Sequence, residues 1–127
     1  MKFLTDWMRD PDAFDPAARI RHVSFAGTTY QLHNLMGPGW YMSVYLEGQH
    51  IGMVDWEDWA AVEATALRHR QRERDSRLRC DVLDARRAAE NGKPLPEHVK
   101  ENARRYMREI AHDQAWKMIS RDPENDD

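Results

Sequence analysis

The chain contains a single cysteine, Cys80, and no long apolar run. One cysteine excludes an internal disulfide framework and a zinc site built from paired cysteines. No segment approaches the roughly 18 apolar residues that a membrane-spanning helix needs. The N-terminal stretch MKFLTDWMRDPDAF also lacks the apolar core of a secretion signal. We therefore expect a cytoplasmic protein.

An excess of charge of one sign is also missing, because 19 basic and 22 acidic residues give a net charge of -3. Residues 1–55 carry four basic and six acidic side chains, and residues 56–91 carry eight of each. Residues 92–127 carry seven basic and eight acidic side chains. The overall charge therefore gives no general attraction to nucleic acids or anionic membranes.

The sequence lacks the motifs that bind phosphate groups or activate a nucleophile. Its only glycine cluster, Gly37-Pro38-Gly39, has neither the spaced glycines of a dinucleotide site nor the Lys-Ser/Thr of a phosphate-binding loop. No serine lies in a G-x-S-x-G context. Nothing in the sequence places a histidine base beside Cys80. We therefore expect no enzymatic activity and no cofactor.

The six histidines are scattered along the chain and form no obvious metal-ligand set. Glu109 and His112 have the Glu-x-x-His spacing of carboxylate-bridged di-iron bundles, but those sites need two copies and two further glutamates. His98 and Asn102 share a helix face without a third ligand. We therefore expect no metal site. An enzyme would instead need a pocket lined by His33, His50 or His112 with converging carboxylates.

What the chain does have is enough apolar and aromatic material for a folded core. Hydrophobic residues make up 41% of its 127 residues, with five Trp, four Tyr and three Phe. Disordered chains are poor in aromatic residues, so this composition predicts a globular protein. The length fits one domain covering residues 1–127.

The first half of the chain predicts a lead-in segment and an antiparallel β-meander. Residues 1–18 are interrupted by two Asp-Pro pairs, and Trp7 and Phe14 are expected to pack this segment on the domain edge. Residues 20–55 alternate in hydrophobicity and predict three or four strands, with tight turns at Ala26-Gly27 and Glu47-Gly48.

Within the meander, alternation assigns side chains to two faces of the sheet. The stretch WYMSVYLE predicts Trp40 and Met42 on one face, and Tyr41 and Tyr45 on the other. The second face is therefore less polar than usual. We expect it to be partly covered or to bind a ligand.

The second half of the chain predicts two long helices that form a helical hairpin, so the fold class is α+β. Residues 56–91 contain no Gly or Pro, and they predict one long charged helix rather than two helices broken near Asp75-Ser76. Asp55 is the expected N-cap, and Asn91-Gly92 marks the end.

A second helix is predicted over residues 96–120, followed by a frayed acidic tail at residues 121–127. Helical spacing predicts the residues that this helix buries. Its expected apolar stripe consists of Val99, Ala103, Tyr106, Met107 and Ile110.

The stretch RHRQRERDSRLR, residues 68–79, is almost entirely charged. Arg70, Arg74 and Arg77 share one helix face, and Arg68, Arg72 and Arg79 form a weaker second stripe. The stretch can be a solvated face with internal ion pairs, a contact surface for an acidic protein, or a phosphate-binding surface. No helix-turn-helix, zinc-finger or RNA-recognition signature accompanies it, which disfavours the third interpretation.

Together these features predict a non-enzymatic protein–protein interaction module, because Trp, Tyr, Arg and Met are enriched at binding hot spots. By analogy of class, it resembles inhibitors or adaptors of phage or mobile-element type that occlude a partner's surface. A homodimer through the long helix is a further expectation. The alternative is a nucleic-acid-binding protein that uses residues 68–79 and the aromatic sheet face. The expected contact residues are Arg68, Arg70, Arg72, Arg74, Arg77, Tyr41 and Tyr45.

Overall fold

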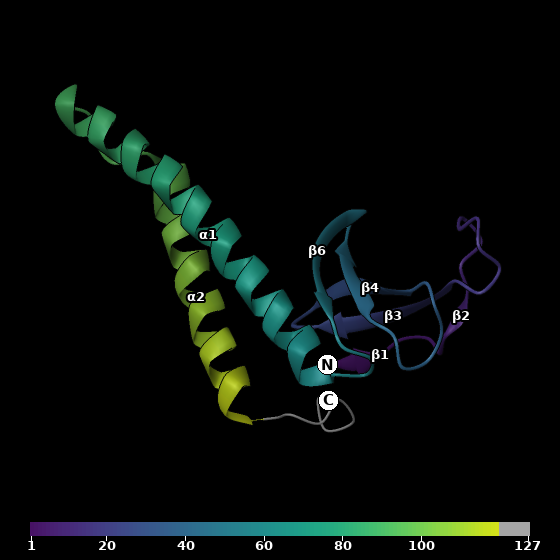
Figure 1. Ribbon diagram of the computed structural model, residues 1–127. Coiled ribbons are helices and arrows are strands. Elements are labelled where there is room, and N and C mark those ends of the chain that lie inside the picture. Colours follow the sequence, from purple (N-terminus) through teal and green to yellow (C-terminus); the bar gives the residue numbers. More distant parts are fainter. Residues whose placement is uncertain (120–127) are drawn as a thin grey trace. The chain divides into compact units, whose positions relative to one another are not determined.

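A computed structural model describes residues 1–119, and the α+β class is confirmed by an antiparallel sheet followed by two long helices (Figure 1). The described chain divides into two compact units, residues 1–67 and residues 68–119. We call these the sheet unit and the helical unit. The predicted tail at residues 121–127 and the predicted last helix residue, 120, lie outside the described residues.

The sheet has six strands rather than the predicted three or four, and every pairing is antiparallel. The order is β1-β3-β4-β5-β6, with β2 also pairing with β3. The two additional strands come from the lead-in segment, and each is only two residues long, which is too short to show alternation. The strands are β1 (Lys2–Phe3), β2 (Met8–Arg9), β3 (Arg19–Phe25), β4 (Thr28–Asn34), β5 (Met42–Leu46) and β6 (Gln49–Val54).

Both predicted tight turns are present. Ala26 and Gly27 have φ values of 53° and 78°, and Glu47 and Gly48 have values of 50° and 80°. Two consecutive positive φ angles are the requirement of the two-residue turn that matches the twist of a hairpin. The turns connect β3 to β4 and β5 to β6 in the register that buries one face of the sheet.

The buried face of the sheet carries Val23, Leu32 and Val44, none of which has any exposed surface. The first turns of α1 (Trp59–Glu90) contribute Val62 and Ala66 to the same core. At Gly52 on β6, an added Cβ would lie 2.6 Å from Cγ2 of Thr65. Glycine is therefore required at residue 52, because the helix approaches the strand closely.

The predicted start of β5 is wrong, because the strand begins at Met42 and leaves Trp40 and Tyr41 outside it. Asn34, which is fully buried, explains the difference. Its side-chain oxygen accepts a hydrogen bond from the Gly37 amide at 2.6 Å, and its side-chain nitrogen donates to the Tyr41 carbonyl at 3.2 Å. These bonds hold the segment before β5 as an irregular loop instead of an extended strand.

The lead-in segment packs on the sheet unit through Trp7, whose ring stacks on Trp56 with centroids 5.2 Å apart. Phe14 does not pack as predicted, because its side chain is fully exposed. It lies between two side-chain-to-backbone turns. Asp10 accepts a hydrogen bond from the Asp12 amide, and Asp15 accepts one from the Ala17 amide.

Helix α1 runs without interruption from Trp59 to Glu90, which confirms one long helix. Its cap is Asp58 rather than the predicted Asp55, because Oδ1 of Asp58 accepts the Ala61 amide at 3.1 Å. The predicted stop is confirmed. Gly92 has a φ of 65°, and the Lys93 amide donates to the Ala88 carbonyl at 2.8 Å, as in a Schellman cap.

Helix α2 covers Glu97–Ile119. The contacts between α1 and α2 within the helical unit run in opposite order along the two helices. Arg74 contacts Asp113, Asp81 contacts Asn102, and Asp84 contacts His98. Within residues 1–119, neither helix has an apolar stretch that would cross a membrane.

Candidate binding surfaces

Two of the five predicted contact arginines are used inside the helical unit. Arg74 is 9% exposed, and its Nη1 donates to Oδ2 of Asp113 at 2.7 Å. Arg70 lies 3.4 Å from the other oxygen of the same carboxylate. Arg68, Arg72 and Arg77 are exposed. The six-arginine stretch therefore does not present all its charges on one outer surface.

The two predicted contact tyrosines lie on different parts of the sheet unit. Tyr45 is on β5, on the face of the sheet opposite the core, whereas Tyr41 lies in the loop before that strand. The prediction that they share a face is wrong because the strand begins after Tyr41. Tyr41 instead lines an open pocket of about 460 Å³, together with Gly39, Trp40, Asp55 and Trp56.

Around Tyr45, the outer sheet face gathers three of the histidines. The ring of His33 lies 4.3 Å from that of Tyr45, and the ring of His50 lies 5.2 Å from it. Gln31 contacts both His22 and His33 at 3.3 Å. His33 on β4 and His50 on β6 lie on strands separated by β5, and each ring contacts that of Tyr45 on the intervening strand.

On this face of the sheet, the environment of His33 shifts the pKa of its imidazole ring. Burial lowers the pKa of His33 from 6.5, although the Asp10 carboxylate at 3.5 Å acts in the opposite direction and His22 lowers it further. The neutral imidazole is therefore favoured on the folded sheet.

The seam between α1 and α2 in the helical unit combines polar and apolar side chains. On α2, the buried and half-buried positions alternate in spacings of three and four, as expected for a helix that packs along one partner helix. They are Val99, Asn102, Tyr106, Glu109, Asp113 and Trp116. On α1 the buried positions that face this unit include Arg74, Asp81 and Ala88.

This seam differs from the predicted apolar stripe of α2. Val99 and Tyr106 do lie on the seam, but Ala103, Met107 and Ile110 lie outside it and are exposed. Met107 is 72% exposed and Ile110 is 43% exposed. The hydrophobic pattern therefore identified residues that the described chain leaves uncovered, and it missed the polar residues that make the seam.

Exposed apolar residues also occur on α1 in the helical unit. Leu78 and Val82 are 48% and 46% exposed. Exposed arginines lie beside the exposed apolar residues of both helices. On α1, Arg79 follows Leu78 and Arg86 lies four positions after Val82. On α2, Arg104 follows Ala103. Within the described part of the chain, these three arginines make no ion pair.

The two units carry net charges of opposite sign, which the charge counts over the predicted segments do not show. Residues 1–67 carry four basic and nine acidic side chains, whereas residues 68–119 carry 14 basic and nine acidic side chains. The sheet unit therefore has a formal charge of -5 and the helical unit one of +5, with histidines neutral. The basic charge of the described chain is therefore concentrated in the helical unit.

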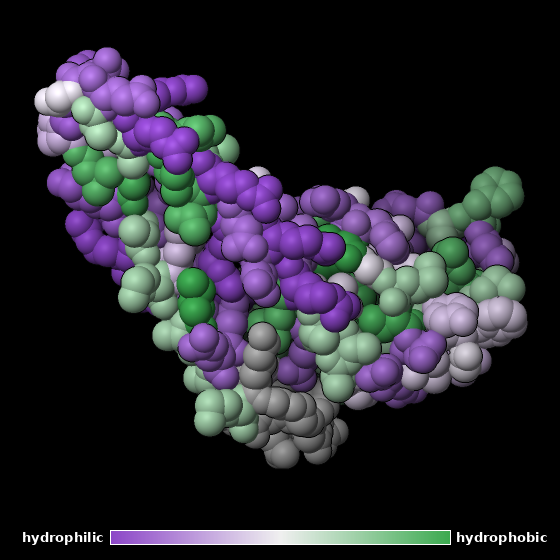
Figure 2. All heavy atoms as spheres, turned by 60° about the vertical axis from the view of Figure 1, so that its left-hand side comes forward, coloured by the Kyte–Doolittle hydropathy of each residue, from purple (hydrophilic) through white to green (hydrophobic). Residues whose placement is uncertain are grey.

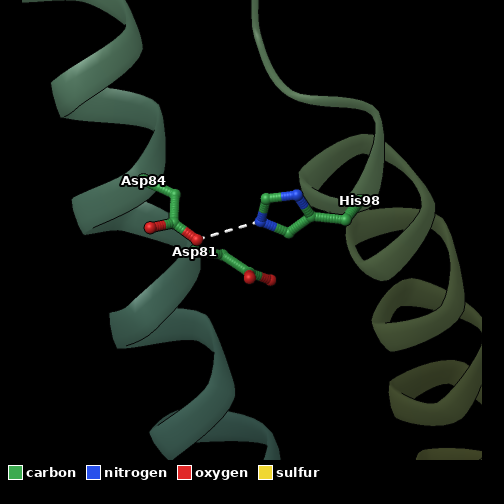
Figure 3. A group of neighbouring side chains, drawn as sticks. All are labelled: Asp81, Asp84 and His98. Carbon is green, nitrogen blue, oxygen red and sulfur yellow. Dashed lines mark hydrogen bonds and ion pairs between the residues drawn. The ribbon is translucent and has the colours of Figure 1, made fainter.

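One cluster in the helical unit has the composition of a metal site (Figure 3). Asp81 and Asp84 on α1 and His98 on α2 place one ligand atom each within 4.8 Å of one another. The cluster combines residues of two helices, so the sequence of either helix alone does not predict it. The spacing of Asp81 and Asp84 indicates one helix face, but only the pairing of the helices brings His98 to them.

Comparison of the chain with protein-family models, curated proteins and solved structures finds no match.

Proposed function

We propose that this protein is a non-enzymatic protein–protein interaction module whose helical unit binds an acidic amphipathic helix of a partner protein. The supporting observation is the exposed apolar stripe on each helix, bordered by arginines. In this role the protein acts as an inhibitor or adaptor that occludes part of the partner's surface. We also propose that α1 and α2 form the hairpin predicted from the sequence, which the opposite order of their contacts supports.

In such a hairpin, the two apolar stripes lie on the same side. Each residue along a right-handed α-helix is rotated by about 100° from the one before it. A residue that follows a seam residue therefore points away from the seam, to one side of the helix pair. When the two helices run in opposite directions, this is the same side of the pair for both helices. Leu78 follows the seam on α1, and Ile110 follows it on α2. Figure 2 shows hydrophobic side chains gathered along the helical part of the chain, between strongly hydrophilic ones. We call this surface the apolar face; it consists of Leu78, Val82, Ala103, Met107 and Ile110.

An amphipathic helix fits this surface because a groove between two helices takes the apolar side of a third. The charge of the bordering residues determines which charge the partner is expected to carry. Arg79 and Arg86 lie on the outer edge of the α1 stripe, and Arg104 lies on the outer edge of the α2 stripe. Acidic side chains flanking the partner's apolar stripe would contact both edges. A second copy of this chain would instead bring two basic edges together, so a homodimer through this face is disfavoured.

Nucleic-acid binding is a second candidate function, because the helical unit has an excess of five positive charges. Phosphate contacts need arginines that are free to reach a backbone. Arg74 is buried against Asp113, and apolar residues occupy the surface between the basic edges. Nucleic acid would leave that apolar face without a complementary surface, and this favours a protein partner.

The proposal is tested by affinity capture from the native host, with the full chain immobilised and the lysate treated with nuclease. The wild-type chain is expected to retain a stoichiometric acidic protein. The Leu78→Ser variant is expected to retain much less of it, because the substitution removes an apolar contact from the apolar face.

Leu83→Ser is the matched control, since Leu83 is also on α1 and is 50% exposed, but lies one position after Val82 and therefore about 100° further around the helix. Equal retention by the Leu78 and Leu83 variants would refute the assignment of the surface. Retention that disappears after nuclease treatment would favour the nucleic-acid function instead.

A further inference from the structure

Two aspartates in the helical unit are equally buried but differ in how their charge is balanced. Asp113 is 5% exposed and contacts the guanidinium groups of Arg70 and Arg74 at 3.4 and 2.7 Å. Asp81 is 6% exposed, and no Lys or Arg in the described part of the chain forms an ion pair with it. A buried carboxylate is stabilised by a nearby positive charge, so a cation bound beside Asp81 would have a larger effect than one bound beside Asp113.

The polar neighbour of Asp81 is neutral. Nδ2 of Asn102 lies 3.4 Å from Oδ1 and 3.2 Å from Oδ2 of the carboxylate. An amide donor fixes the orientation of a carboxylate but supplies no net charge. Hydrogen bonds of this kind are typical of the residues that orient metal ligands.

Asp84 and His98 add a second carboxylate oxygen and an imidazole nitrogen to the possible metal ligands of the cluster. Asp84 follows Asp81 by three positions, so both carboxylates lie on one face of α1. His98, in the first turns of α2, places its Nε2 2.9 Å from Oδ2 of Asp84 (Figure 3). His98 is exposed, so the cluster is open to solvent on that side and an ion can enter.

We propose that Asp81, Asp84 and His98 bind one divalent transition-metal ion, with Asn102 as a positioning residue. Two carboxylates and one imidazole suit Zn²⁺ or Mn²⁺, with water completing the coordination. In the structure the three ligand atoms lie within 4.8 Å of one another. Bonds from zinc to its ligand atoms of about 2.0–2.2 Å need the ligand atoms to be closer together than that, so the side chains move slightly toward the ion when it binds. The bound ion balances Asp81 and links α1 to α2 near the turn at Gly92.

The proposal is tested by calorimetric titration of the full chain with ZnCl₂ and, separately, MnCl₂, followed by reversal with EDTA. Wild-type protein is expected to bind one ion with saturation and to unfold at a higher temperature in its presence. Asp84→Asn and His98→Gln are expected to weaken binding by more than about tenfold. Both positions are at least partly exposed, so these variants should retain the fold, which circular dichroism verifies.

Two control variants separate this cluster from other acidic and histidine side chains. Asp75→Asn changes an exposed aspartate of α1, and His112→Gln changes an exposed histidine of α2, both outside the cluster. Both are expected to bind the ion as the wild type does. The proposal is wrong if neither metal gives saturable binding, or if Asp84→Asn and His98→Gln bind as tightly as these controls. In either case His98 serves only as an ion-pair partner of Asp84.

Discussion

Arg74 and Asp113 form a buried ion pair between α1 and α2, with Nη1 2.7 Å from Oδ2. The arginine comes from residues 68–79, a stretch that is almost entirely charged. Its guanidinium is nevertheless in the seam, where Glu109 at 3.8 Å gives a second acidic neighbour. A buried ion pair thus joins the middle of α1 to α2, in the same seam as the buried side chain of Tyr106.

Asp113→Ala is predicted to destabilise the helical unit strongly. The substitution leaves the Arg70 and Arg74 guanidinium groups without their shared carboxylate, and removing one partner of a buried pair costs about 3 kcal/mol. Urea unfolding followed by the helical circular dichroism signal measures the change. The double substitution Arg74→Met/Asp113→Leu is expected to cost less than Asp113→Ala, because no buried charge of the pair remains. A loss below about 1 kcal/mol for Asp113→Ala would indicate an ordinary surface ion pair.

Gly52→Ala is predicted to destabilise the sheet unit by about 1–3 kcal/mol, because the new methyl group would lie 2.6 Å from Cγ2 of Thr65. Thr65→Ser removes that Cγ2 and retains the hydroxyl that donates to the Ala61 carbonyl at 2.8 Å. The double variant is therefore expected to recover much of the lost stability. The coupling is measured from the free energies of unfolding of the wild type, the two single variants and the double variant. If the effects of the two substitutions simply add, the close approach of β6 and α1 is contradicted.

His33 is predicted to make the folded state more sensitive to acid. Burial lowers its folded-state pKa below 6.5, so the unfolded chain binds the proton more readily. Stability from the neutral ring is therefore fully present above about pH 6.5 and is lost as the pH falls through the lower folded-state pKa. His33→Gln is expected to flatten the stability profile in this range, as measured by urea unfolding between pH 7.5 and pH 5.

An NMR titration of the His33 ring separates the causes of this shift. Asp10 raises the pKa of His33, so Asp10→Asn should lower that pKa further below its wild-type value. A rise in the pKa of His33 in the Asp10→Asn protein would contradict the assigned contact between the two side chains.

Arg86→Glu is predicted to weaken partner binding more than Arg87→Glu. Both arginines are exposed on α1, but Arg86 borders the apolar face and Arg87 lies on another side of the helix. Binding assays at low and high salt should show a smaller salt dependence for Arg86→Glu than for the wild type, because an attraction to acidic partner residues has been removed. Equal affinities for the two variants would exclude a basic edge at Arg86.

Local backbone chemistry made parts of the fold predictable from sequence. Ala26-Gly27 supplies the positive φ angles of a hairpin turn, and Gly92 supplies the positive φ angle of a helix end. The start of β5 was not predictable from alternation, because it depends on hydrogen bonds from the buried side chain of Asn34. The two-residue strands β1 and β2 exist through pairing with β3, which no local pattern records.

The candidate surfaces were less predictable, because they depend on which helix faces meet. Apolar spacing predicts that Met107 and Ile110 are buried, although the structure exposes them. The spacing of three and four that marks the seam is carried by polar residues such as Asn102 and Asp113. The cluster around His98 likewise combines residues from two helices, and no spacing within one helix indicates it.

The most direct test of the proposed function is the affinity of the captured partner for Leu78→Ser and Leu83→Ser, measured by calorimetry with purified proteins. The two leucines lie on the same helix and are 48% and 50% exposed, so their loss should perturb the isolated chain similarly. We predict that Leu78→Ser weakens binding about tenfold or more, whereas Leu83→Ser binds as the wild type does. Equal affinities, or weaker binding by Leu83→Ser, would contradict the assignment of the apolar face as the partner-binding surface.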